Sequence, residues 1–239
     1  MKEGQLLFHQ GWTDIFNCLP LINYYLQTYD RLYVFIREDA LRLFHFYCKQ
    51  FDDRVVALVD SKPDASSTIP MFEDVDYLFH GDYDMHRTDS YQNMYSESSD
   101  DFVKRFYVPY DIPYSMRVTH FEFERDLELE AERYEKFTAE FGMNYVLQHS
   151  VPLSPDRVSY PIVELNQRSE LFFDMIQVCE RAKEMHLLDS SWACFLYLLD
   201  AKYGLFQHIP IYVYCMRDYS DMFLEPVRLA NWHIMIRPA

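Results

Sequence analysis

Glycine is scarce in this chain, with only 5 among 239 residues. The sequence contains neither a Gly-x-x-x-x-Gly-Lys phosphate loop nor a Gly-x-Gly-x-x-Gly fingerprint, and it lacks the Gly-x-Ser-x-Gly turn of many hydrolases. Kinase, dehydrogenase and serine-hydrolase functions therefore lose their main sequence support. Each remaining glycine is more informative, because only glycine adopts positive φ angles at little cost.

Long apolar runs are also missing. No stretch reaches 18 residues, and the N-terminal segment Met1–His9 has no signal-peptide core. The cysteines are odd in number and form no Cys-x-x-Cys pair, which is typical of reduced core thiols. They are Cys18, Cys48, Cys179, Cys194 and Cys215. These absences predict a cytoplasmic protein without a transmembrane segment.

Basic residues are few. The chain has 22 Lys and Arg residues and 38 Asp and Glu residues, which gives a net charge of −16. Such a protein repels the phosphate backbone of nucleic acids at long range, so we expect no nucleic-acid partner. A small anionic ligand remains compatible with this charge. Helix N-termini and one or two basic side chains can hold it locally.

What the first part of the chain does contain is a regular alternation of strand and helix patterns. Strands are predicted at 5–9, 31–37, 54–60 and 75–80, and helices at 15–28 and 39–51. The strands are nearly continuous apolar runs, as buried parallel strands are. A polar segment at 81–99 has no clear period and is a candidate acceptor-side loop.

The pattern begins again in the second part. Helices are predicted at 101–107 and 122–141, the latter stopped by Gly142, then strands at 145–148, 162–165, 186–188 and 211–215 and helices at 169–183 and 190–203. Residues 225–236 could be a last helix or a last strand. The element order predicts an α/β fold of two Rossmann-like β/α/β halves facing a cleft, residues 1–142 and 143–239.

Ligands of open parallel sheets bind at the carboxyl ends of the strands, so the polar turns there are the candidate sites. The first turn contains His9, Gln10 and Gly11, followed by Asp14. Gly11 permits close backbone approach, and Asp14 lies at the start of a helix. A simple alternative is that Asp14 only caps that helix.

Two further turns belong to the second half. His149 and Ser150 follow one strand, with Arg157 in the next loop. Asp189, Ser190 and Ser191 directly precede a helix, where hydroxyls and free N–H groups suit a diphosphate. Turn capping, a solvated basic residue and helix capping are the respective alternatives.

Two further patterns of charged residues are candidate sites, and each has a simpler explanation. Asp82 and Asp84 form an Asp-x-Asp pattern after an apolar strand, which could bind a divalent metal, although such pairs arise by chance in an acidic chain. Arg125 is an acceptor-side candidate. It belongs to a mixed-charge patch with Asp126 and Glu130, however, and such patches usually form ion pairs on a solvated face.

The segment Gly11–Ile22 (Gly-Trp-Thr-Asp-Ile-Phe-Asn-Cys-Leu-Pro-Leu-Ile) resembles the first strand-to-helix turn of the bacterial heptosyltransferase family. Thr13 stands where that family usually has glycine. The resemblance implies a GT-B fold, in which two Rossmann-like domains carry the substrates, and an inverting reaction without metal or cofactor. It also implies that Asp14 is the catalytic base.

Further along, Glu184–Ala193 is similar to the strand-turn-helix that holds the phosphates in GT-B donor domains. The order of several short motifs also resembles that of small glycosyltransferase-like proteins of microbes and viruses. Those motifs are Phe106-Tyr107, Ile112–Tyr114, Arg125-Asp126, Glu130 and Tyr145–His149. The resemblance implies a nucleotide-sugar donor and a glycan or other hydroxyl acceptor.

Two other functions stay open from the sequence. One is a metal-dependent transferase of the GT-A fold that uses Asp82 and Asp84. The other is a nucleotide-binding or interaction module without catalytic activity, which the shortness of the chain for a two-domain enzyme favours.

Overall fold

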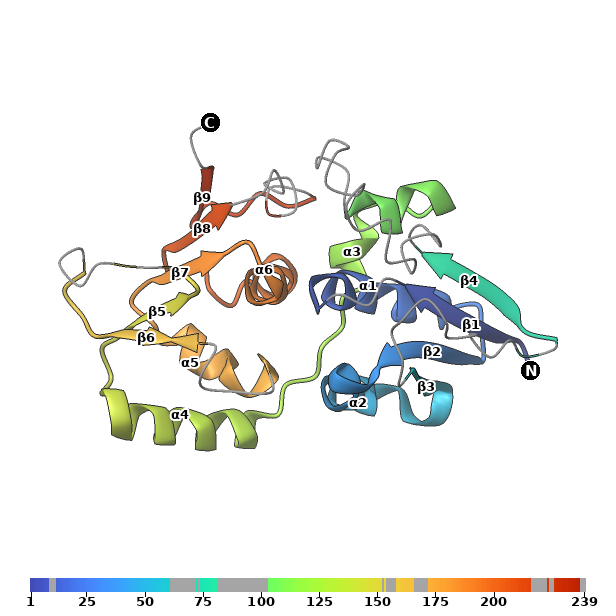
Figure 1. Ribbon diagram of the computed structural model, residues 1–239, viewed down its shortest axis with the longest axis horizontal. Helices are drawn as coiled ribbons and strands as arrows, with labels where there is room; N and C mark the ends of the chain where they lie inside the picture. The colour runs from blue at the N-terminus through green and yellow to red at the C-terminus, as the bar shows by residue number, and fades with distance from the viewer. Residues whose placement is uncertain are drawn as a thin grey trace. The chain divides into compact units, whose positions relative to one another are not determined.

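A computed structural model describes residues 1–8, 12–60, 72, 74–80, 103–151, 153, 158–165, 172–215, 223 and 226–236. The chain divides into two compact units, Met1–Glu124 and Arg125–Ala239, which we call unit 1 and unit 2 (Figure 1). Each unit contains one parallel sheet flanked by helices. The predicted α/β fold with two Rossmann-like halves is therefore confirmed.

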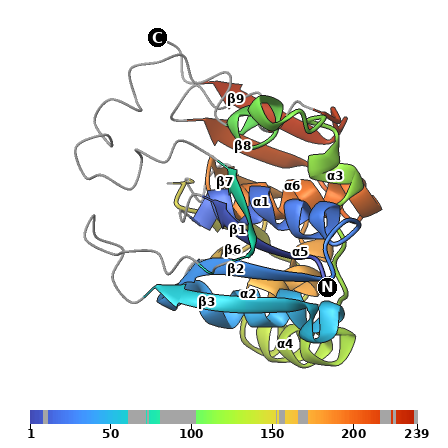
Figure 2. The same cartoon turned by 90° about the vertical axis from the view of Figure 1, so that its right-hand side faces the viewer.

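Unit 1 is built on a four-stranded parallel sheet, shown in Figure 2. Its strands are β1 (Glu3–Phe8), β2 (Arg31–Arg37), β3 (Val55–Asp60) and β4 (Asp76–His80), in the order β3-β2-β1-β4. Gly4 on β1 is packed tightly, since a Cβ atom there would lie 3.0 Å from side-chain atoms of both Leu32 and Tyr29. This close approach accounts for one of the few glycines.

Helices α1 (Trp12–Tyr25) and α2 (Leu41–Cys48) connect the first three strands. The segment 103–121 then packs along α1 through two short 3-10 helices and α3 (Met116–Thr119). Asn23 on α1, for example, donates its side-chain N–H to the backbone oxygen of His120 at 2.7 Å. Within the helix predicted at 101–107, the described part forms only a 3-10 turn at Lys104–Phe106.

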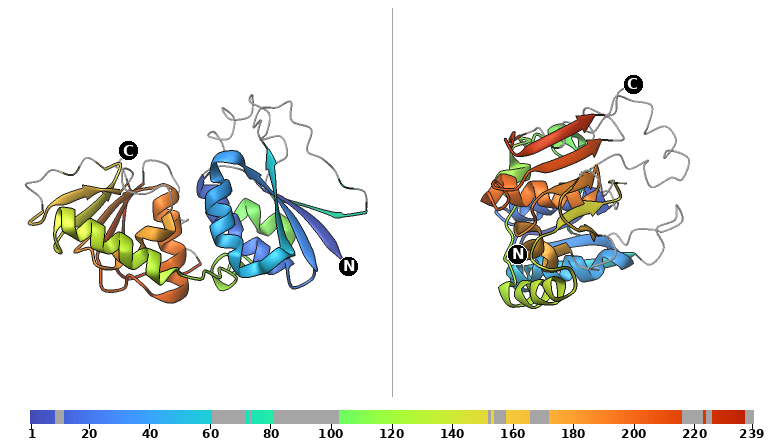
Figure 3. Two further views of the ribbon diagram at one scale, coloured as in Figure 1. Left: turned by 90° about the horizontal axis from the view of Figure 1, so that it is seen from below. Right: turned by 90° about the vertical axis from the view of Figure 1, so that its left-hand side faces the viewer.

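Unit 2 contains a five-stranded parallel sheet, which Figure 3 shows in its right-hand view. Its strands are β5 (Val146–His149), β6 (Ile162–Glu164), β7 (Met185–Leu188), β8 (Ile211–Cys215) and β9 (Trp232–Ile236), in the order β6-β5-β7-β8-β9. Residues 225–236 could have been a helix or a strand from the sequence, and β9 shows that this segment ends as a strand.

Three helices accompany this sheet: α4 (Leu127–Phe141), α5 (Ile176–Glu180) and α6 (Ser191–Tyr203). α5 is preceded by a 3-10 turn at Phe172–Met175, so the helix predicted at 169–183 is shorter and less regular than expected. Every residue of α6 from Trp192 to Asp200 is buried. A helix that is apolar on all sides is an interior element.

The division between the units lies at Glu124 and Arg125, whereas the sequence pattern placed a boundary at residue 142. α4 accounts for the difference, because it packs within unit 2. Arg133 on α4 donates two hydrogen bonds to Asp174, at 3.0 and 2.8 Å, and the Phe137 ring lies 4.7 Å from that of Tyr145. Gly142 ends α4 as predicted, with φ of 79°.

A row of aromatic rings crosses three strands of unit 2. His186, Tyr212 and His233 are in register on β7, β8 and β9, and their ring centroids are 4.7 and 5.0 Å apart. His186 is 8% exposed, and its Nδ1 atom lies 3.0 Å from the Tyr214 hydroxyl. Burial lowers the pKa of His186, and the nearby carboxylate of Glu184 opposes that shift.

The cysteines are buried in the two units, and the helices are short or polar. All five cysteines are buried and free, and burial raises the pKa of Cys215 to about 12. Such thiols are unreactive near neutral pH. Within the described part of the chain, no helix has the length and apolar character needed to cross a membrane.

Candidate functional site

The direction of the chain across the sheet reverses between two neighbouring strands of unit 2. β6 lies on one side of β5, whereas β7, β8 and β9 follow one another on the other side. The carboxyl ends of β5 and β7 flank this point. β5 ends at His149 and is followed by Ser150, and β7 is followed by Asp189 and Ser190. In open α/β sheets, a ligand crevice forms where the strand order reverses.

His149 and Ser190 meet at this point. The Ser190 hydroxyl oxygen lies 2.9 Å from Nδ1 of His149, which is 7% exposed. Ser190 immediately precedes α6, but its side chain makes no capping hydrogen bond to the helix. Helix capping therefore does not explain this serine. The fold brings together two predicted donor-binding residues that are 41 positions apart.

Ser150 has an unusual backbone conformation beside this pair, with φ of 55°. Its N–H group donates to the Glu164 carboxylate at the end of β6, at 3.2 and 3.4 Å from the two oxygens. Glu164 was not among the predicted site residues, but an acidic residue that ends the second strand of a Rossmann-like unit is a known hydrogen-bond acceptor for ribose.

The start of α6 completes the candidate site in unit 2. Ser191 is the first residue of the helix, and the N–H of Asp189 donates to the backbone oxygen of Tyr214 at 3.2 Å. The N-terminus of a helix carries partial positive charge, which favours an anion such as a phosphate group. Arg157, the basic candidate, lies outside the described residues.

Asp14 belongs to unit 1, where it is the third residue of α1 and 3% exposed. It lies inside the first helical turn, so it does not occupy the capping position that the alternative interpretation gave it. The first turn is a favourable place for a carboxylate, because the helix dipole is positive there. The neighbouring candidates His9, Gln10 and Gly11 are outside the described residues.

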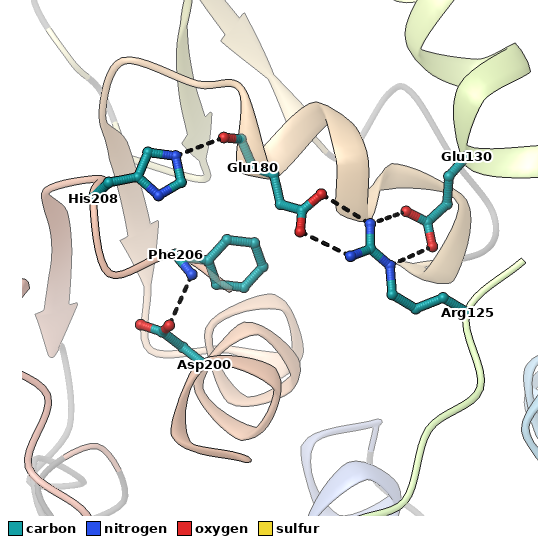
Figure 4. Close-up of polar contacts among 6 residues, drawn as sticks. All are labelled: Arg125, Glu130, Glu180, Asp200, Phe206 and His208. Atoms are coloured by element: carbon teal, nitrogen blue, oxygen red, sulfur yellow. Dashed lines mark hydrogen bonds and ion pairs between the residues drawn. The ribbon is translucent and has the colours of Figure 1, made fainter. Parts of the chain in front are cut away.

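Arg125 is bound by two carboxylates within unit 2, as Figure 4 shows. Its Nε donates to Glu130 at 3.0 Å, and its Nη1 and Nη2 donate to Glu180 at 2.8 and 2.9 Å. Glu130 is 1% exposed, and burial raises its pKa while the hydrogen bonds from Arg125 oppose that rise. The contacts favour an anchoring role, and the acceptor-side role of Arg125 stays a prediction.

The prediction of metal binding concerned Asp82 and Asp84. These two residues, like the rest of segment 81–99, lie outside the described part of the chain. Among the residues that are described, no group of three or more His, Cys, Asp or Glu side chains could hold a metal ion.

Comparisons with known proteins give one informative result. No protein-family model matches the sequence, and no curated protein does. The fold is similar to the crystal structure of the glycosyl transferase family 9 protein from Veillonella parvula DSM 2008. The TM-score is 0.54 at 9% identity, over 100% of this chain and 88% of that chain. The likeness shows that the two chains share a fold.

Proposed function

We propose that this protein is a glycosyltransferase that moves a sugar from a nucleotide-sugar donor to a hydroxyl acceptor, with inversion and without a metal. The observation that carries the proposal is the His149–Ser190 contact at the start of α6, where the strand order of unit 2 reverses. This is the place where the fold offers hydrogen-bond donors and positive partial charge to a diphosphate.

Donor binding is assigned to unit 2. Ser190, Ser191 and the first N–H groups of α6 bind the diphosphate, with His149 and Arg157 as further donors. Ser150 and Glu164 form the neighbouring part of the site, where a carboxylate can accept hydrogen bonds from ribose hydroxyls.

Catalysis is assigned to Asp14 of unit 1. Its carboxylate accepts the proton of the acceptor hydroxyl while that oxygen attacks the anomeric carbon. The bond from this carbon to the diphosphate oxygen breaks, and the electron pair leaves with the diphosphate. A single displacement inverts the configuration. We assign acceptor binding to the residues around Asp14, which are His9, Gln10 and Gly11.

The test combines binding and turnover. Calorimetry with UDP, GDP and ADP should show binding of at least one nucleotide, and a panel of the matching nucleotide-sugars should show transfer or slow hydrolysis. Asp14→Asn should lower kcat by about 10²- to 10⁴-fold, the usual contribution of a general base, without weakening nucleotide binding. The control is Asp53→Asn, because the Asp53 side chain is 89% exposed.

Each outcome selects one function. Undiminished turnover by Asp14→Asn would remove the base assignment. Turnover that is lost with EDTA and restored by Mn²⁺ would favour the metal-dependent alternative at Asp82 and Asp84. Nucleotide binding without transfer or hydrolysis would favour a catalytically silent binding module, and the absence of any nucleotide binding would reject the donor site.

A further inference from the structure

Helix α1 contains a proline, Pro20, in its interior. Proline has no N–H to donate to the carbonyl four residues earlier, and its ring displaces that carbonyl. The proline therefore takes no part in one i to i−4 backbone bond of α1, the one to the carbonyl of Phe16. Asp14 lies in the first half of α1, which also receives contacts from other elements of unit 1.

Those contacts converge on Asn17, one turn after Asp14. The Tyr107 hydroxyl donates to the backbone oxygen of Asn17, and Arg117 Nε donates to its side-chain oxygen at 2.7 Å. The partners are 90 and 100 positions away in the sequence. We call Asn17, Tyr107 and Arg117 the Asn17 cluster.

The Asn17 side chain also contacts the first turn of α1, in which Asp14 lies. Its Nδ2 donates to the backbone oxygen of Thr13 at 2.8 Å. That oxygen belongs to the peptide group that joins Thr13 to Asp14. A fixed Asn17 amide therefore restrains the peptide group that precedes the Cα atom of Asp14, which carries the side chain.

Arg117 shows that these contacts are more than ordinary core packing. Its side chain is completely buried, at 0% exposure, as is Asn17. Burying a guanidinium is costly unless it is hydrogen-bonded, and an apolar residue of similar volume could fill the same space at lower cost. Arg117 also donates from Nη1 to the Tyr114 hydroxyl at 3.1 Å, which fixes the guanidinium plane.

We infer that Asn17, Tyr107 and Arg117 are positioning residues for Asp14. They hold the first turn of α1 in the orientation in which the Asp14 carboxylate meets the acceptor hydroxyl. The inference rests on the proposed function for its catalytic consequence, and on the contacts of the Asn17 cluster for its structural content.

The experiment uses the full chain with the substitutions Tyr107→Phe and Arg117→Lys. Tyr145→Phe is the matched control, because the Tyr145 hydroxyl also donates to a buried backbone oxygen, that of Val178 at 2.8 Å, but in unit 2. Tyr107→Phe and Tyr145→Phe should lower the melting temperature similarly. Only Tyr107→Phe and Arg117→Lys should lower kcat, by at least about tenfold, with KM for the nucleotide-sugar within about twofold of wild type.

A second measurement does not depend on turnover. The ¹³C resonance of the Asp14 side-chain carboxylate, assigned by its loss in Asp14→Asn, should move in Tyr107→Phe and Arg117→Lys and stay in place in Tyr145→Phe. If Arg117→Lys does not fold, Tyr107→Phe decides both measurements.

The outcomes separate this inference from the proposed function. An Asp14 resonance that is the same in wild type and in both variants overturns the inference, and so does a kcat that falls no further than in Tyr145→Phe. If wild type transfers no sugar, the proposed function fails. The resonance then still decides whether the Asn17 cluster orients Asp14.

Discussion

Ser190 occupies the position where a serine commonly caps a helix, but its hydroxyl contacts His149 instead of the first turn of α6. The residue type alone cannot separate these two roles, because both use the same side-chain oxygen. Loss of a capping serine destabilises a helix by about 1 kcal/mol, and loss of the hydrogen bond to His149 costs a similar amount, so ligand affinity is the measurement that separates the two roles.

We therefore expect Ser190→Ala to lower the melting temperature by about 2–4 °C, because its hydrogen bond to the buried His149 is lost. Its affinity for the nucleotide should fall by roughly fivefold, the effect of one hydrogen bond of about 1 kcal/mol. Thermal denaturation and calorimetry measure the two effects. Ser115→Ala, an exposed serine of unit 1, is the control. A lower melting temperature with unchanged affinity would give Ser190 a purely structural role.

His186 leads to a prediction about pH. Its pKa is lower in the folded protein than the ordinary value of about 6.5 in the unfolded chain, because burial disfavours the charged ring. The unfolded state therefore binds more protons as the pH falls through that value, and stability decreases on acidification from neutral pH. His186→Phe should reduce this loss in melting scans at several pH values. The exposed neighbour substitution His233→Phe is the control, and an equal effect of both would contradict the assignment.

At the scale of elements, the pattern of apolar runs predicted the strands and the places where polar turns follow them. Strand existence depends on local sequence, and the carboxyl ends of β5 and β7 are recognisable for that reason. Contacts between residues that are far apart in the sequence cannot be predicted from local patterns. The contacts of Glu164 with Ser150 and of Arg117 with Asn17 depend on strand order and on packing along α1. Helical periodicity likewise predicted α4 but not the unit against which it packs.

The start of α4 offers a test of the role of Arg125. Arg125→Met leaves the buried Glu130 carboxylate without its partner, which typically costs about 3–5 kcal/mol. Urea unfolding should show this loss, and the double substitution Arg125→Met with Glu130→Leu should recover much of it. Lys136→Met is the control, since the Lys136–Glu132 pair is exposed on the same helix. A stable Arg125→Met variant with weakened acceptor binding would instead support the acceptor-side role.

At the scale of the whole molecule, the proposed division of labour assigns the nucleotide to unit 2. Hydrogen exchange on the full chain should therefore slow on nucleotide addition at two places, the end of β5 with Ser150 and the first turn of α6. β3 in unit 1 serves as the internal control. Protection that appears in β3 and is absent at α6 would contradict the assignment of donor binding to unit 2.

The strand orders of the two sheets also bear on how the protein folds during synthesis. Parallel neighbours pair only after a crossover has closed, so sheets of this kind form slowly compared with helical proteins. β1 leaves the ribosome before β2 and β4, but it lies between them in its sheet and needs both. The sheet of unit 1 therefore cannot be completed before residue 80 has emerged. No strand of unit 2 takes part in it, so it can form while β5 to β9 are still being translated.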